Sequence, residues 1–415
     1  MSTNVDPTTS IDAGRLLRRI AELAAIGADR LGGVTRPGFG AADRAAIQYL
    51  RDTVRADRLH STVDPAGNLI IRGGARSGDR PVLLMGSHID TVVNGGRLDG
   101  SYGVLAAIEV LTTITTSGPP TRCEPVVVAF ANEEGALFQQ PFWGSLAIAG
   151  GLADTTVPAV GVEDHSLSDA LRLAGGDPAD IQGAAWPPGT IESYLELHIE
   201  QGPVLERTGA RIGIVDRIVG RTVFDVEIHG TAGHAGTTPM SMRRDGLATA
   251  AHVILAVQRI AAERCLCRVA TVGHISVAPN NTNVVPGRVR LTVEIRDTTT
   301  ESLLVAEAEV RREIKEISER TTVPISVTVT TRVDPRSTDD RLRALIGDAA
   351  DALDLPSVVL PSGAGHDAQI IAAVAPIAMI FVPSVGGVSH VPEEHTADED
   401  LVAGAQVLLH TVLRH

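Results

Sequence analysis

The spacing of apolar residues divides much of the chain into short strands that alternate with helices. Residues 81–85 (PVLLM) and 125–131 (PVVVAFA) are continuous apolar runs, typical of strands that are buried on both faces of a sheet. Residues 102–115 (YGVLAAIEVLTTIT) follow the first run and form an apolar stretch of helical length. This alternation predicts a doubly wound α/β domain with a mixed, mainly parallel sheet.

Periodic apolar positions extend this domain toward the N-terminus. Residues 16–24 carry apolar side chains at helical spacing after Ser10 and Asp12, either of which can cap a helix. A second helix is expected over residues 41–56, and residues 62–72 are expected to form a hairpin. We interpret residues 1–9 as a loose tail.

The pattern changes near residue 217 and indicates a second domain. A strand and a helix are followed by two strands, a helix and a last strand, the β-α-β-β-α-β order of a ferredoxin-like unit with an antiparallel sheet. These elements are expected at residues 223–229, 244–264, 268–277, 289–295, 301–320 and 324–331. Patterns of the first kind return at residues 341–353, 376–382 and 398–413. We therefore predict a catalytic domain, residues 1–216 and 332–415, with the second domain inserted at residues 217–331.

Residues 86–103 (GSHIDTVVNGGRLDGSYG) connect the first buried strand to the helix that follows it. His88 stands at the carboxyl end of that strand, where open α/β sheets place their chemistry, and Asp99 precedes the helix. Imidazole and carboxylate are ligands for zinc or manganese, so both residues are candidate metal ligands. Asp90 is placed to accept the other ring N–H of His88 and so to fix its tautomer. On this stretch alone, a glycine-rich turn with a solvated histidine explains the pattern equally well.

Glu133 and Glu134 follow the strand at residues 125–131. Adjacent carboxylates at a strand end repel each other, so they need a cation or a proton between them. An acidic pair on the surface is the alternative interpretation.

Two further histidines complete a candidate set at the same edge of the sheet. Residues 194–201 (YLELHIEQ) alternate strictly and place His198 on the polar side of a strand, and His390 lies past the strand at residues 376–382. If Asp99 bridges, two metal ions each have three protein ligands, and Glu133 is left as a general base. The predicted ligands are His88, Asp99, Glu134, His198 and His390.

Charge and cysteine content exclude several partners. The net charge of −14 argues against nucleic acid and anionic membranes as partners. The three cysteines fit neither a disulfide framework nor a CxxC metal pair. The N-terminus has no apolar core of signal-peptide type, and the longest uncharged apolar stretch, residues 370–383, is too short to span a membrane. We expect a cytoplasmic protein that binds neither nucleic acid nor a membrane.

Several stretches carry a family resemblance. They are GSHIDTVVNGGRLDG (86–100), ANEEGALF (131–138), ELHIEQGPVLE (196–206), GHAGTTPM (233–240), NVVPG (283–287), PSGAGHD (361–367) and GVSHVPEE (387–394). With them the whole chain resembles the dinuclear metallo-amidohydrolases of the aminoacylase and carboxypeptidase superfamily. It is most similar to the branch of N-carbamoyl-L-amino-acid hydrolases, allantoate amidohydrolases and β-ureidopropionases, for which HIEQGP and GHAGTTPM are specific.

The resemblance implies roles for individual residues. One metal ion would be held by His88, Asp99 and His198, the other by Asp99, Glu134 and His390, and Glu133 would be the base. His234 would stabilise the oxyanion, and Asn283 with Arg296, aided by Gln201, would bind the substrate carboxylate. Gly365 and His366 would lie near the substrate. A guanidinium is the natural bidentate partner of a carboxylate, although Arg296 could instead pair with its neighbour Asp297.

The resemblance also implies an activity and an assembly. The expected reaction converts an N-carbamoyl-L-amino acid into the L-amino acid, carbon dioxide and ammonia, with two divalent ions of Zn, Mn, Co or Ni. Allantoate is the nearest alternative substrate, favoured by the stretch FWGS at residues 142–145. A dipeptidase, an acylase and a non-catalytic binding protein are further alternatives. We expect a homodimer formed through the inserted lid domain, which would close on a small ureido substrate and could exchange substrate-binding groups between subunits.

Overall fold

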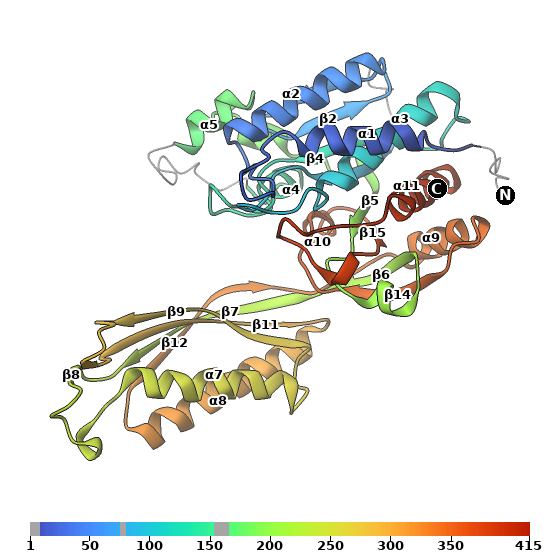
Figure 1. Ribbon diagram of the computed structural model, residues 1–415. Coiled ribbons are helices and arrows are strands. Elements are labelled where there is room, and N and C mark those ends of the chain that lie inside the picture. The colour runs from blue at the N-terminus through green and yellow to red at the C-terminus, as the bar shows by residue number, and fades with distance from the viewer. Residues whose placement is uncertain (1–8, 75–79, 153–165) are drawn as a thin grey trace. The chain divides into compact units, whose positions relative to one another are not determined.

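The computed structural model describes residues 9–74, 80–152 and 166–415, so most of the predicted N-terminal tail lies outside the described residues. The chain forms two compact units (Figure 1). The first unit combines Met1–Asp216 with Ser337–His415, and the second is Arg217–Arg336.

The first unit is built on a nine-stranded sheet with the order β1-β2-β4-β3-β5-β15-β6-β13, and β14 pairs with β6. Its four central strands, β4 (Glu124–Phe130), β3 (Val82–His88), β5 (Ile191–Ile199) and β15 (Ile377–Val382), are parallel. The pairs β1–β2, β2–β4 and β15–β6 are antiparallel. The prediction of a mixed α/β fold with a mostly parallel central sheet is therefore confirmed. The outer strands are β1 (His60–Val63), β2 (Leu69–Arg72), β6 (Ile212–Ile218), β13 (Arg336–Ser337) and β14 (Ser357–Ser362).

Helix α3 (Ser101–Ser117) is the central helix of this unit and packs on β3, β4 and β5. Its side chains are buried on nearly all sides, because α1 (Ala13–Ala24) and α11 (Asp398–Arg414) cover it. Burial of each large apolar side chain contributes about 1.5–3 kcal/mol, which fixes the start of α3 against the sheet. The other helices are α2 (Ala41–Ala56), α4 (Trp143–Ile148), α5 (Leu167–Leu173), α6 (Val204–Thr208), α9 (Asp340–Ala352) and α10 (Asp367–Ile371).

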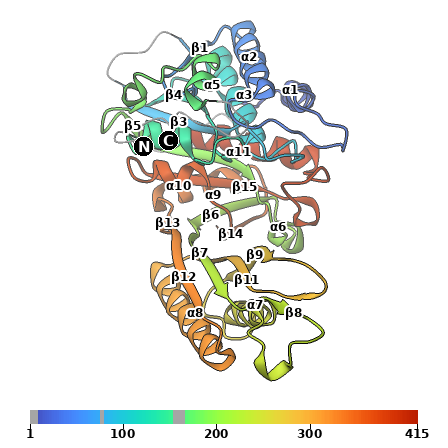
Figure 2. The same cartoon turned by 90° about the vertical axis from the view of Figure 1, so that its left-hand side faces the viewer.

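The second unit is a four-stranded antiparallel sheet with two helices (Figure 2). Its order is β12 (Ile325–Val333), β7 (Gly220–His229), β11 (Arg288–Asp297) and β9 (Val269–Ala278). Strand β7 alternates buried and half-buried residues, and its buried side chains pack with those of α7 (Gly246–Ala262) and α8 (Thr300–Thr321). Along the chain the elements follow the predicted β-α-β-β-α-β order. Beyond the end of β7, β8 (Gly233–His234) pairs with β10 (Val284–Val285).

Hydropathy separates these helices from membrane spans. Across residues 9–74, 80–152 and 166–415, none of the helices combines the length and apolar character that crossing a bilayer demands.

Candidate metal centre

The parallel strands of the first unit bring several polar side chains to one edge of the sheet. His88 ends β3 and is paired with Phe130, the last residue of β4. His198 lies one residue before the end of β5, opposite Phe381 of β15. Because parallel strands end at the same edge, the loops that carry Glu133, Glu134 and His390 start beside these histidines.

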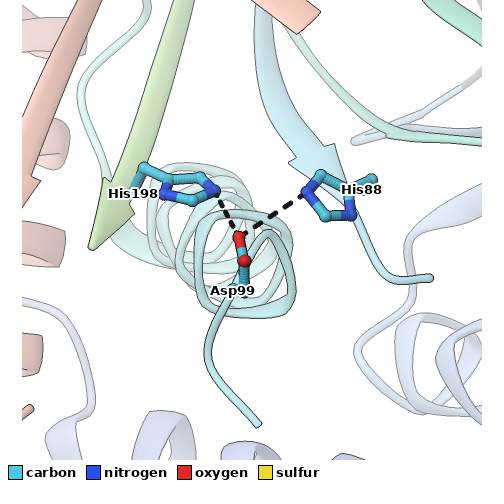
Figure 3. A group of neighbouring side chains, drawn as sticks. All are labelled: His88, Asp99 and His198. Atoms are coloured by element: carbon cyan, nitrogen blue, oxygen red, sulfur yellow. Dashed lines mark ion pairs between the residues drawn. The ribbon is translucent and has the colours of Figure 1, made fainter. Parts of the chain in front are cut away.

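A first group of ligand atoms forms around one oxygen of Asp99. Oδ1 of Asp99 lies 3.1 Å from Nε2 of His198 and 3.9 Å from Nε2 of His88 (Figure 3). Gly100 makes room for this approach, since a Cβ at this position would lie 2.4 Å from Nε2 of His88, and its φ of +61° favours glycine. The three side chains are buried and point toward one another.

A second group forms around the other oxygen of Asp99. Oδ2 lies 2.8 Å from Nε2 of His390, which in turn lies 3.5 Å from Oε1 of Glu134. In each group the ligand atoms lie within 4.8 Å of one another. The carboxylate of Asp99 thus presents one oxygen to each group, which is the arrangement that a bridging ligand requires.

Hydrogen bonds set the ring orientation of both buried histidines. Nδ1 of His88 lies 3.0 Å from the carbonyl oxygen of Asp90, and Nδ1 of His198 lies 2.9 Å from that of Ile199. Because a carbonyl only accepts, each Nδ1 donates its proton, which leaves Nε2 as the ligand atom of the neutral ring. The N–H of Gly100 points at Nε2 of His198, at 3.1 Å, in agreement with this tautomer. Both Nε2 atoms are therefore available as ligands.

Electrostatics also favour a cation at this edge. Burial, and then the carboxylate of Asp99, raise the pKa of Glu134 to about 8. Burial, and then the carboxylates of Asp367 and Glu134, raise the pKa of Glu133 well above its usual value. Burial lowers the pKa of His88 to about 4, so its imidazole is neutral, as a ligand must be. Burial lowers the pKa of His198, but the bond to Asp99 more than offsets this and the pKa is raised to about 9. The same bond raises the pKa of His390 to about 9, so a cation beside Asp99 would take the place of a proton on these two rings. This crowding of carboxylates and imidazoles fits a divalent cation.

The chain as a whole is similar to proteins of one family. Residues 84–414 match the model of Peptidase family M20/M25/M40. This chain belongs to that family. It is 41% identical to an N-carbamoyl-L-amino acid amidohydrolase of Geobacillus stearothermophilus, over 97% of this chain and 98% of that protein. It is 36% identical to the allantoate amidohydrolase of Escherichia coli (strain K12), over 93% and 94% of the two chains.

A solved structure agrees with these relatives. The crystal structure of an amidase of the hydantoinase/carbamoylase family from Burkholderia multivorans has a TM-score of 0.88 and 34% identity, and the match covers 98% of both chains. The predicted resemblance to the amidohydrolase branch is therefore confirmed, and the chain is a hydrolase. Membership of the family also implies a requirement for divalent metal ions.

Glu133 is the candidate base. It lies beside the group formed by His88, Asp99 and His198 but belongs to neither group of ligand atoms. Its Oε2 is 3.7 Å from Nε2 of His88, and only 8% of the residue is exposed, so the pair with Glu134 is not a surface feature. The carboxylate of Asp90 accepts the backbone N–H groups of Glu133 and Glu134, each at 3.1 Å. Asp90 was expected to accept the ring N–H of His88 through its carboxylate; its backbone carbonyl lies closer, and the carboxylate instead holds the Glu133 loop.

Of the other predicted residues of the first unit, Gln201 lies beside Asp99 and His366 beside His198. Nε2 of Gln201 donates to Oδ2 of Asp99 at 3.0 Å. His366 is buried, with its ring centroid 4.7 Å from that of His198. A Cβ on Gly365 would lie 3.0 Å from the ring of Phe142.

The predicted residues of the second unit are split between the two ends of its sheet. His234 and Asn283 are neighbours, because β8 pairs with β10 and the N–H of Ala235 donates to the carbonyl of Asn283 at 2.9 Å. Arg296 lies near the far end of β11 and its Nε donates to Glu294 at 2.6 Å. Arg288, at the end of β11 that follows Asn283, is eight residues from Arg296, or roughly 26 Å at the rise of an extended strand. The structure thus separates Arg296 from the residue predicted to share the substrate carboxylate with it.

Arg36 is a buried residue at the metal centre that carries no recognisable sequence signal. Its Nε donates to the carbonyl of Ile89 at 2.6 Å, and its Nη2 donates to the hydroxyl of Ser101 at 2.8 Å. It therefore ties the segment after His88 to the start of α3, which follows Asp99. A lone arginine in a loop has no periodicity, so pattern analysis passes over it.

Proposed function

We propose that this chain hydrolyses N-carbamoyl-L-amino acids to the L-amino acid, carbon dioxide and ammonia. The observation that supports this most is the carboxylate of Asp99, shared between two groups of ligand atoms beside a buried carboxylate that belongs to neither group, Glu133. The relatives named N-carbamoyl-L-amino acid amidohydrolase match the chain at up to 41% identity, against 36% for the bacterial allantoate amidohydrolase.

Two divalent ions are proposed as cofactors. His88, Asp99 and His198 would hold one, and Asp99, Glu134 and His390 would hold the other. Bound ions of this kind polarise a carbonyl and lower the pKa of water.

Glu133 is the proposed general base and then general acid. Its carboxylate would take a proton from the attacking water and return it to the amino-acid nitrogen as the carbon–nitrogen bond breaks. The other product, carbamic acid, decomposes to carbon dioxide and ammonia. The N–H bonds to Asp90 support this role, because they hold the Glu133 backbone while its side chain stays outside both ligand groups.

His234 is the proposed donor to the developing oxyanion. Its Nδ1 accepts the N–H groups of Gly236 at 3.0 Å and Thr237 at 3.2 Å, so Nε2 carries the proton and can donate. This side chain is exposed, as a group that must reach a substrate has to be. Its tautomer supports the role that the resemblance implies.

Asn283 and Arg296 are proposed to bind the substrate carboxylate from two different subunits. Asn283 precedes the ten-residue strand β11 and Arg296 lies near the far end of it, so the two cannot both reach one small substrate. A homodimer would solve this if one subunit supplied Arg296 and the other supplied His234 and Asn283. Exposed apolar side chains on α7 and β9 support an interface there; they are Leu247, Leu255, Val269 and Ile275.

The second unit is accordingly proposed as a lid and dimerisation domain. The cytoplasm is proposed separately as the compartment. A substrate panel tests the activity: N-carbamoyl-L-amino acids, allantoate, ureidopropionate and dipeptides, each with Zn, Mn, Co or Ni, followed by ammonia and amine release. We expect the carbamoyl substrates to be cleaved fastest. Faster turnover of allantoate would reassign the substrate, and cleavage of dipeptides alone or of none of these compounds would reject the proposal.

A further inference from the structure

Glu394 is a buried carboxylate four residues beyond His390 that has no role in the proposed reaction. Only 3% of the residue is exposed. It lies in the loop that leaves β15 and carries His390 across the edge of the sheet. An ionised carboxylate in such a place requires several donors to offset its burial.

The donors to Glu394 come from two loops that are far apart in the sequence. Its Oε1 accepts the backbone N–H of Leu98 at 2.8 Å and that of Asp99 at 3.1 Å. Its Oε2 accepts the hydroxyl of Ser389 at 2.7 Å, and the same hydroxyl lies 3.3 Å from Oδ2 of Asp99. One side chain thus holds both the backbone of Asp99 and the residue next to His390.

The opposing loop is shaped to receive this carboxylate. A Cβ on Gly96 would lie 2.0 Å from the carboxylate carbon of Glu394, so only glycine permits the close approach. Both oxygens of Glu394 are occupied by donors from these two loops, which makes the residue a support of the ligands rather than a ligand.

We propose that Glu394 is a positioning residue that holds the bridging carboxylate of Asp99 and the His390 loop in register. This inference rests on the proposed metal centre. Without Glu394, the backbone of Asp99 could rotate, and its two oxygens would no longer face the His88–His198 group and the His390–Glu134 group together. The support should therefore act on ion affinity before it acts on any substrate.

The test compares Glu394 with Glu109, a buried carboxylate of the same unit placed in α3. Glu109 accepts the backbone N–H of Asp12 at 2.8 Å and the guanidinium of Arg15, and so fastens α1 instead of a ligand loop. The variants are E394A, E394Q, E109A and E109Q. Ion affinity is measured by competition with a chromogenic chelator, ion content by elemental analysis, and stability by thermal unfolding of the metal-free protein.

We expect E394A to bind divalent ions about 10–100-fold more weakly, the range typical of residues that orient metal ligands. E394Q should stay within a few-fold of the unchanged protein, because its amide oxygen can accept both N–H groups and its NH2 can donate to Ser389. E109A should lower the unfolding temperature of the metal-free protein and leave ion affinity unchanged.

Unaltered affinity in E394A, or an equal loss in E109A, would reduce Glu394 to a general stabilising residue and overturn the inference. If E394A fails to fold, S389A replaces it: loss of this one donor should weaken binding several-fold, and no change would count against the inference. Substrate turnover by the unchanged protein is scored separately. Two tightly bound ions without carbamoyl hydrolysis would reject the proposed function and leave the role of Glu394 standing, whereas absence of ion binding would reject both.

Discussion

The two sheets of this protein distribute polar residues in opposite ways. In the first unit, parallel strands end at one edge, and His88, Glu134, His198 and His390 converge there although they are separated by up to 302 residues in the chain. In the second unit, neighbouring strands run in opposite directions, so His234 and Arg296 fall at opposite ends of the sheet. The parallel sheet of this protein thus gathers its candidate ligands within one unit, whereas the antiparallel sheet disperses its candidates, which the proposed homodimer would bring together.

The largest effect is expected for Glu133→Gln, at the sheet edge where the parallel strands of the first unit end. Glutamine keeps the shape of the side chain and removes the base, so turnover should fall by about 10²–10⁴-fold while ion content and fold stay unchanged. Ammonia release under saturating substrate gives the turnover, and elemental analysis gives the ion content. Near-normal turnover would assign the base to another residue.

Asp99→Asn tests whether one carboxylate serves both groups. Its two oxygens face His198 and His390 separately, so loss of the charge should weaken the binding of both ions together. Glu134→Gln is the matched control, since Glu134 belongs to the second group only, and it should lose one ion. Loss of a single ion from Asp99→Asn would contradict a bridging role.

Most of the candidate ligands at this sheet edge could be predicted, because apolar runs in the sequence indicate where strands end. The runs at residues 81–85 and 125–131 correspond to β3 and β4, and the alternation at residues 194–201 corresponds to the end of β5, so the sequence alone predicts that the polar residues at these strand ends lie together. Strand β6 has no such contrast with its surroundings and was not predicted, nor was β14.

The supporting contacts and the split of the second unit were harder to predict. Arg36 and Glu394 act through hydrogen bonds to loops that are distant in the sequence, and such contacts leave no periodic pattern in it. The β-α-β-β-α-β order of the second unit follows from its sequence pattern, but the distance between Asn283 and Arg296 depends on strand direction and register, which the pattern does not give.

Heterodimers test whether the dispersed residues of the second unit are reunited across subunits. His234→Ala and Arg296→Ala should each be nearly inactive, because every site of either homodimer lacks one group. Co-expression with two different affinity tags isolates the mixed dimer, in which sharing between subunits leaves one of two sites intact. The expected activity is then about half that of the unchanged dimer. No recovery would place both residues in the same subunit's site, and sedimentation as a monomer would reject the dimer itself.

The smallest effect is expected for Arg36→Lys, a change of a buried arginine that is compared with the same change at an exposed one. Arg36→Lys keeps the positive charge but cannot reach both the carbonyl of Ile89 and the hydroxyl of Ser101, so buried acceptors are left unpaired. Each unpaired group costs about 1–3 kcal/mol, and the unfolding free energy of the metal-free first unit should fall accordingly. Arg288→Lys is the control from the second unit: its side chain is 64% exposed and pairs with Glu227, so the change should stay within about 0.5 kcal/mol. Denaturant unfolding of both variants measures the difference. If Arg36→Lys were as mild as Arg288→Lys, the bonds from Arg36 would not hold the His88 and Asp99 segments together, and the convergence of the ligands would rest on the parallel strands and α3 alone.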